Sequence, residues 1–494
     1  MSDSLHQPWL RGIAFNPSAP AEVLTRLLDR TAGEAGLLMC EGRDLPDAVI
    51  EAALHHPARP VRRALAGNRH IDLSRLAPLA TDPSGFVRVR LANPYGHPRP
   101  RRVRPLPDDI IVTLLTAQDG GSEDALLTEH EIVQELISSR QIPRSFYRAM
   151  AGHQLPSLRE RAAPGWQSLT PTEREALLTD SDPTVREAAR KSSWVLDPER
   201  VEAKLPRIGS LSRPFFLGVC ALSPALIEQC FAERTQGLLA WNRHIPADVV
   251  ARLARDPDAE IRKMIAARPD LGPELAAELG EDPDEGVRMR ARIHPFPRTW
   301  AELRAIQEVL DHGPDCAHPI TEPDTEPSPA WFAACAVSGE PVLRRVAATW
   351  PGLPSELVAT LARDEDEEVR IRLACHQPSA PPDLLVEVFA ARPAHRPHLL
   401  SLPAFPRTGL AHLVGHPDPE VRALAAADPA LVEPPVNDPE ESVRRAAAAN
   451  PGLTPEALEA LLHDPRTAEG AAANPSLPVP RMHALLDRCL LPSP

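Results

Sequence analysis

The residues with the clearest chemical potential recur as pairs of an aspartate and an arginine six positions apart. The pairs are Asp82 and Arg88, Asp256 and Arg262, Asp282 and Arg288, Asp364 and Arg370, and Asp438 and Arg444. A row of arginines could bind a phosphate or carboxylate ligand, since the guanidinium group matches both anions. Alternatively, the aspartate caps a helix and the arginine pairs with an acidic or carbonyl group of an adjacent repeat. Because the pair returns along the chain, whereas a binding site would belong to one region, we expect a structural ladder.

The segment 94–107 is proline-rich and strongly basic. Its cations are Arg99, Arg101, Arg102 and Arg104. Such a patch could contact an anion, such as a phosphate, a nucleic acid or the protein's own acidic surface. It could equally be a solvated loop between two repeats. We keep these arginines as candidate partner contacts.

Aromatic residues gather between about 120 and 235, where the sequence pattern diverges from the rest of the chain. They include Tyr147, Trp166 and Trp194, together with Phe146, Phe215 and Phe216. One interpretation is that these rings fill the core of repeats whose sequences have diverged from the common pattern. The other is that they line a contact surface, since Trp, Tyr and Arg are enriched at binding hot spots. We therefore name Tyr147, Trp166 and Trp194 as candidate partner-binding residues.

Metal binding and catalysis find little support in the sequence. His312, Cys316 and His318 could be imagined as metal ligands, but a fourth ligand is missing and their spacing fits no standard zinc pattern. The nucleophile elbow, the phosphate-binding loop, the dinucleotide fingerprint and the paired-histidine zinc motif are all absent from the sequence. We expect no catalytic residue, no metal and no cofactor, and hence no enzyme.

Composition narrows the possible partners and the compartment. The chain has 494 residues and a formal net charge of −14, with a pI near 5.7. This acidic balance argues against nucleic acid, whose binders usually carry a basic patch, and favours a basic protein or peptide. The seven cysteines are scattered and odd in number, as in a reduced cytosolic protein. No apolar stretch reaches the roughly 18 residues of a membrane span, so we expect a cytoplasmic protein.

A recurring sequence motif must position all of these residues. Its clearest copy, ANPGLTPEALEALLHDP, begins at Ala449, and the Val-Arg elements of successive copies lie 26 positions apart, as from Val61 to Val87 and from Ile261 to Val287. Thr454 can cap a helix that starts with Pro455, and Leu458, Leu461 and Leu462 share one face of it. Asp464-Pro465 is expected to start a second helical segment in the same way. Neither segment can bury its apolar face alone, so the pattern predicts an all-α stack of repeats of about 25 residues, without a sheet.

The order Asn-Pro, hydrophobic-Pro, Leu-x-x-Leu, Asp-Pro, Val-Arg resembles the bacterial leucine-rich repeat variant (LRV) family, and more broadly the HEAT-like α-solenoids. The resemblance covers residues 10–95, 236–300 and 340–490. It implies alternating α-helices and short or 3₁₀ helices wound into a right-handed solenoid. One LRV protein carries an iron–sulfur cluster on amino-terminal cysteines. Because Cys40 is the only cysteine among the first two hundred residues here, that cluster is not expected.

These patterns divide the chain into five segments. We expect LRV-like repeats at 1–95, 236–310 and 330–494, diverged helical repeats at 96–235, and an acidic, proline-rich insertion at 311–329. The expected function is a non-catalytic scaffold that binds an unidentified protein or peptide through its solenoid surface. The alternative is a HEAT-like nucleic-acid-binding protein or an enzyme of the DNA glycosylase type, for which the arginines at 99–104 are the supporting feature.

Overall fold

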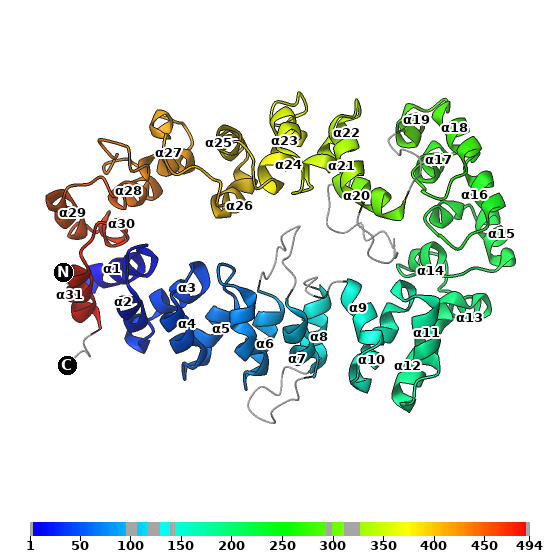
Figure 1. Cartoon of the computed structure of the whole chain (residues 1–494), viewed down its shortest axis with the longest axis horizontal. Coiled ribbons are helices and arrows are strands. Elements are labelled where there is room, and N and C mark those ends of the chain that lie inside the picture. The colour runs from blue at the N-terminus through cyan, green and yellow to red at the C-terminus, as the bar shows by residue number, and fades with distance from the viewer. Residues whose placement is uncertain are drawn as a thin grey trace. The chain divides into compact units, whose positions relative to one another are not determined.

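The structure, a computed structural model, describes residues 3–94, 106–116, 129–138, 142, 144–292, 299–310 and 327–490. Within these ranges every regular element is a helix, and none of these residues forms a strand. The prediction of an all-α fold is therefore confirmed for the described chain. Successive helices lie side by side along each part of it (Figure 1).

The chain divides into two compact units. The first comprises Met1–Ile142, Phe389–Ser401 and Phe405–Pro494, so it joins the two ends of the sequence. Its α-helices are α1 (Asp3–Phe15), α2 (Ala21–Arg26), α3 (Glu34–Gly42), α4 (Asp47–Leu54), α5 (Arg59–Ala66), α6 (Gly85–Ala92), α7 (Asp108–Thr116), α8 (Glu129–Ser138), α26 (Arg396–Ser401), α27 (Pro419–Ala426), α28 (Glu441–Ala448), α29 (Pro455–Leu462), α30 (Ala468–Ala472) and α31 (Val479–Cys489). Its 3₁₀ helices are η1 (Arg30–Ala32), η2 (Leu73–Thr81), η6 (Pro393–His395) and η7 (Ala411–Leu413).

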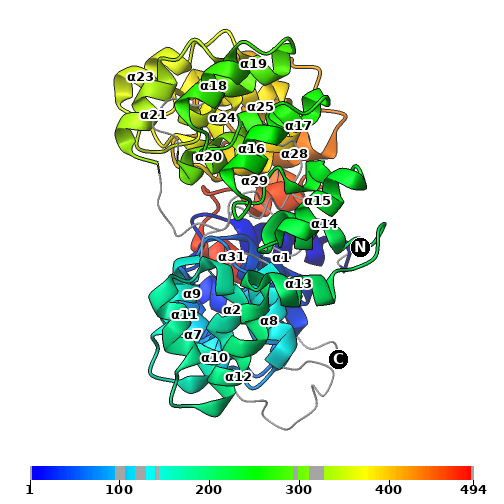
Figure 2. The ribbon, with the colours of Figure 1, turned by 90° about the vertical axis from the view of Figure 1, so that its right-hand side faces the viewer.

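The second unit comprises Pro143–Val388 and Leu402–Ala404. Its α-helices are α9 (Arg144–Ala151), α10 (Pro156–Ala162), α11 (Pro171–Leu178), α12 (Pro183–Ser192), α13 (Pro198–Lys204), α14 (Arg213–Val219), α15 (Pro224–Ala232), α16 (Ala247–Leu253), α17 (Ala259–Ala266), α18 (Pro273–Gly280), α19 (Glu285–Arg292), α20 (Trp300–Leu310), α21 (Pro329–Ala336), α22 (Pro341–Ala348), α23 (Ser355–Leu361) and α24 (Glu367–His376). Its 3₁₀ helices are η3 (Ala163–Ser168), η4 (Ser193–Leu196) and η5 (Gln236–Leu239), and α25 (Pro382–Ala391) crosses the boundary between the units. Neighbours in this unit, such as α10, α11 and α12, can be followed in Figure 2.

One repeat of the first unit shows why the sequence folds this way. The hydroxyl of Thr454 accepts a hydrogen bond from the backbone N–H of Ala457 (3.3 Å), and Pro455 begins α29 where a missing N–H costs nothing. Leu458 and Leu462 are buried, while Leu461 is half-buried at the edge of the same face. The stripe packs on neighbouring helices such as α30, because α29 is too short to bury it alone.

In the repeats of Asp438 and Asp464 the aspartate of the Asp-Pro element does not cap a helix, which corrects the sequence interpretation there. Asp182 and Asp418, which also precede prolines, are the N-caps of α12 and α27. The carboxylate of Asp438 accepts a hydrogen bond from the backbone N–H of Glu440 (2.9 Å), and Glu440, not Asp438, is the N-cap of α28. Asp464 likewise accepts from the N–H of Arg466 (2.9 Å), and α30 starts at Ala468. These aspartates close a side-chain turn that lies ahead of the helix.

Alternation of α and 3₁₀ helices is found at few positions. The segment 73–81 is a 3₁₀ helix, η2, and it contains Pro78. Elsewhere the Leu-x-x-Leu segments are mostly α-helices, such as α18, α23 and α29.

Within the first unit, the first helix of the chain packs on the last ones. α1 contacts α30 and α31, and α2 also contacts α31. The indole N–H of Trp9 donates to the carbonyl oxygen of Leu462 (2.8 Å), and Arg26 pairs with Asp487 (2.6 Å). The two ends of the sequence are therefore neighbours in a single core (Figure 1).

Candidate interaction surface

The recurring arginine joins two consecutive repeats. Arg262 donates from Nη1 to the carbonyl oxygen of Asp256 in its own repeat (2.8 Å). Its Nε and Nη2 donate to the two carboxylate oxygens of Asp282 in the next repeat, at 2.7 and 2.9 Å. Both side chains are largely buried, at 14% and 7% exposure. This two-point geometry fixes the distance and orientation between neighbouring repeats.

The same bonding recurs in both units. The pairs across repeats are Arg62 with Asp82, Arg159 with Asp180, Arg344 with Asp364, and Arg422 with Asp438. In four repeats a histidine or serine takes the aspartate's place ahead of the helix, and the arginine still donates to its carbonyl oxygen. These residues are His56, His153, Ser338 and His416. The spacing of an aspartate and an arginine six apart is lost in these repeats, although the arginine itself marks them.

The bonds shift the ionisation of the paired carboxylates. The hydrogen bond from Arg262 holds the pKa of Asp282 below its ordinary value, and Arg422 does the same for Asp438. The carboxylate of Asp282 raises the pKa of Arg262 in turn. Both groups are therefore charged at neutral pH.

The remaining ladder arginines also donate to carbonyl oxygens of their own repeats. Arg288 donates to the carbonyl oxygen of Asp282 (2.6 Å), Arg370 to that of Asp364 (2.7 Å), and Arg444 to that of Asp438 (2.8 Å). Arg370 also pairs with Glu387 at 3.4 Å. The guanidinium groups along the ladder are thus engaged by carbonyl and carboxylate oxygens of the protein.

A second connection between repeats runs through the asparagine of the Asn-Pro element. The side-chain amide of Asn450 is fully buried and donates to the carbonyl oxygens of Ala426 and Asp428 of the preceding repeat, both at 2.8 Å. Its amide oxygen accepts from the N–H of Gly452 (2.8 Å). Equivalent bonds are made by Asn16, Asn68, Asn242 and Asn474.

In the sequence, this asparagine is visible only as the residue that recurs before proline. Its recurrence in the sequence motif was the signal that could have indicated a structural role. The buried carbonyl oxygens to which it donates belong to another repeat. In three repeats a longer polar side chain makes these bonds, and the first is Arg43, which donates to the carbonyl oxygens of Ala14 and Asn16. Arg268 donates to the carbonyl oxygens of Ala240 and Asn242, and Gln377 to that of Trp350.

The candidate partner contacts fall into three groups. Arg99, Arg101, Arg102 and Arg104 lie outside the described residues, as does the side chain of Tyr147 in α9. Trp166 is 3% exposed in η3, and its carbonyl oxygen accepts from Nε of Arg174 (2.9 Å), so it is a core residue rather than a surface contact. Trp194 in η4 is half-buried, and its ring centroid lies 5.1 Å from that of Phe216.

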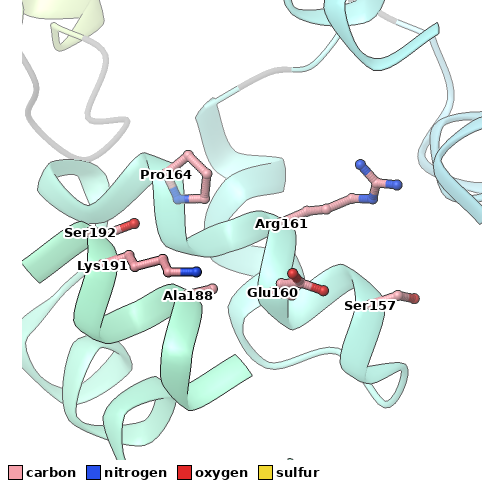
Figure 3. A pocket seen from close by; sticks show the side chains of 7 residues that line it. All are labelled: Ser157, Glu160, Arg161, Pro164, Ala188, Lys191 and Ser192. Carbon is pink, nitrogen blue, oxygen red and sulfur yellow. The ribbon is translucent and has the colours of Figure 1, made fainter. Parts of the chain in front are cut away.

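A shallow pocket of about 390 Å³ lies between α10 and α12 in the second unit (Figure 3). Its lining side chains are Ser157, Glu160, Arg161, Pro164, Ala188, Lys191 and Ser192. Lys191 pairs with Glu187 of its own helix at 3.6 Å. Figure 3 shows charged groups of both signs around the opening, so the pocket favours neither anions nor cations.

The sequence profile of the family described as leucine rich repeat variant matches residues 442–466, which include most of α28 and the whole of α29. These residues form an LRV repeat. The resemblance to the LRV family that was inferred from the recurring sequence motif is thereby confirmed. No curated protein matches the chain.

The described cysteines lie inside the helical stacks or, for Cys489, at their edge. Cys40, Cys220, Cys230, Cys335 and Cys375 are buried, and none of the described thiols forms a disulfide. Burial raises the pKa of the Cys40 and Cys335 thiols to about 12. These thiols are protonated at neutral pH and serve as apolar packing groups.

No cluster of three or more His, Cys, Asp or Glu side chains among the described residues is arranged to hold a metal ion. The three residues considered as ligands, His312, Cys316 and His318, lie outside the described ranges. No helix in the described ranges is long and apolar enough to cross a membrane.

Proposed function

We propose that this LRV repeat protein is a non-catalytic scaffold that binds another protein or a peptide. The observation that carries the proposal is the pair of inter-repeat connections, the arginine–aspartate ladder and the buried asparagines. They commit the recurring polar side chains to stacking, so the outward side chains are left to vary between repeats. A stack of this kind presents an extended surface suited to a macromolecular partner.

The finer architecture belongs to the same proposal. We infer that repeats within each unit wind as a right-handed α-solenoid, as the resemblance to the LRV family implies. The chain would work in the cytoplasm, where its scattered thiols stay reduced. The net charge of −14 favours partners with basic surfaces over nucleic acid.

An affinity capture tests the function. Tagged full-length protein is incubated with a lysate of the source organism, with and without nuclease, and retained proteins are quantified by mass spectrometry. A scaffold should retain one or a few proteins in near-stoichiometric amounts regardless of nuclease treatment. Purified candidates should then bind the purified chain in isothermal calorimetry.

Two outcomes would overturn the proposal. Retention that disappears with nuclease would indicate a nucleic-acid-binding protein, and direct titration with labelled duplex and single-stranded DNA and RNA would then show binding. Turnover of a captured small molecule or macromolecule by the purified chain would indicate an enzyme.

A further inference from the structure

Three large apolar side chains of the second unit face solvent within eight residues. Ile208 is 62% exposed, Leu211 is fully exposed, and Phe215 is 49% exposed. They lie in the loop between α13 and α14 and at the start of α14. Soluble proteins rarely leave apolar side chains gathered in this way unless the surface has a partner.

Two further rings extend this surface. The centroid of Phe215 lies 6.1 Å from that of Phe216 in an edge-to-face arrangement, and Phe216 lies 5.1 Å from Trp194. Phe216 and Trp194 are half-buried. The rings therefore form a continuous row from the surface into the unit. We call Trp194, Ile208, Leu211, Phe215 and Phe216 the α13–α14 patch.

The loop that carries the patch is anchored. The buried guanidinium of Arg213 donates to the carbonyl oxygen of Pro206 (2.7 Å) and to the carboxylate of Glu233 (2.9 Å). Gly209 adopts φ +85°, a backbone conformation that favours glycine, and this turns the chain between Ile208 and Leu211. A surface held in place in this way loses little conformational entropy when a partner binds.

Charged side chains of both signs lie near the patch: Glu199 of α13 is exposed, and Glu202 accepts a hydrogen bond from the hydroxyl of Ser223. Lys204 and Arg207 are exposed, and neither forms an ion pair with a carboxylate in the described part of the chain. The ammonium of Lys204 lies 5.4 Å from the centre of the Trp194 ring, so it borders the apolar row directly. Arg200 adds a third exposed cation, held by the hydroxyl of Ser193 and the carbonyl oxygen of Arg190.

We propose that the α13–α14 patch binds an acidic amphipathic segment of another protein. Leucine or aromatic side chains of the segment pack on Leu211 and Phe215, and its carboxylates pair with Lys204 and Arg207. The inference rests on the proposed scaffold function and specifies its partner. This partner differs from the basic one that the net charge favours, because the charged group shown beside the apolar row is the ammonium of Lys204.

Two synthetic peptides provide the test. One is a fluorescein-labelled helix-forming peptide with Leu and Phe on one face and Glu on the other, and its twin has Lys at each Glu position. Fluorescence anisotropy measures their binding to the full-length protein. The acidic peptide should bind at least about tenfold more tightly than its twin, and added salt should weaken it.

Three variants locate the site. L211S/F215S should reduce affinity for the acidic peptide at least about tenfold, since it removes the apolar contacts. K204E/R207E should reverse the preference in favour of the lysine peptide. V337S removes a side chain of the same unit that is 70% exposed outside the patch, and it should bind like the wild type. Circular dichroism checks that each variant is folded.

The inference fails if both peptides bind alike, if neither binds, or if the patch variants bind like the wild type. It also fails if the wild type self-associates in sedimentation velocity and L211S/F215S does not, since the occupant would then be a second copy of the chain. The scaffold proposal is judged separately. A partner captured equally well by wild type and L211S/F215S leaves the scaffold intact and rejects only the patch.

Discussion

The side-chain amide of Asn16 donates a hydrogen bond to the backbone carbonyl oxygen of Asn474, 458 positions away, at 2.6 Å. The same amide donates to the carbonyl oxygen of Ala472 at 3.0 Å. Asn474 makes the corresponding pair of bonds to Asn450 and Ala448, at 2.7 and 3.0 Å. The first repeat thus stacks on the last as though it followed it in the sequence.

Glycine packing repeats the relationship. A Cβ added to Gly12 would lie 2.2 Å from the carbonyl oxygen of Glu469, and one added to Gly470 would lie 2.1 Å from that of Arg445. In both cases a small residue lets one helix approach the backbone of the repeat before it. The junction between the chain ends in the first unit therefore has the geometry of an internal junction.

Substitution at this junction should loosen it locally. We expect G12V to destabilise the first unit by about 2 kcal/mol, because the new side chain collides with backbone that cannot yield. Hydrogen exchange with mass spectrometry should show faster exchange in α1 and α30 and unchanged exchange in α16–α19. G280V is the matched control, since a Cβ at Gly280 meets no atom within 4 Å. Equal exchange in G12V and wild type would contradict the junction.

The ladder pairs should be energetically coupled. Arg344 and Asp364 are 12% and 7% exposed, so R344A and D364A should each destabilise the second unit by about 1–3 kcal/mol by leaving a buried partner uncompensated. Because both variants break one interaction, a double-mutant cycle should give a coupling energy of at least about 0.5 kcal/mol. The control pair, Arg252 and Glu228, is 48% and 63% exposed, and its cycle should give less than that. Additive losses at 344 and 364 would argue against a ladder.

Acid should unfold the protein through the ladder carboxylates. The pKa of Asp282 and that of Asp438 are lowered by Arg262 and Arg422. A lowered folded-state pKa stabilises the fold fully above the unfolded-state value, about 4, and the stabilisation is lost as pH falls through the folded-state pKa. The unfolding temperature measured by circular dichroism should therefore fall steeply below about pH 4. D282N should be less stable at pH 7 and should show a shallower acid slope, whereas D487N, at a side chain 64% exposed, should keep the wild-type slope. An identical slope in D282N would exclude this explanation.

The buried thiols should be slow to react. Burial raises the pKa of Cys40 and Cys335 to about 12, so little thiolate exists at neutral pH. With iodoacetamide at pH 7, both should be alkylated on the timescale of unfolding, and urea should accelerate them at least about a hundredfold. Quantitative mass spectrometry of the alkylated peptides measures each rate. Fast alkylation of native Cys335 would place its side chain at the surface instead of in the core.

The sequence by itself determined the helical class and the repeat. Pro455 after Thr454, with Leu458 and Leu462 on one face, is local information, because caps and periodicity act within one helix. The same locality explains what was misassigned. Asp438 and Arg444 are six apart in the sequence, but the aspartate closes a turn ahead of α28 instead of capping it.

Only the tertiary structure decided which residues meet across repeats. Arg262 bonds to Asp282, twenty positions on, and Asn16 bonds to Asn474 at the other end of the chain. Such contacts depend on the stacking of helices that no local pattern encodes. Exposure is decided in the same way: Trp166 and Trp194 belong to one stretch of sequence, yet packing buries the first and leaves the second beside an open surface.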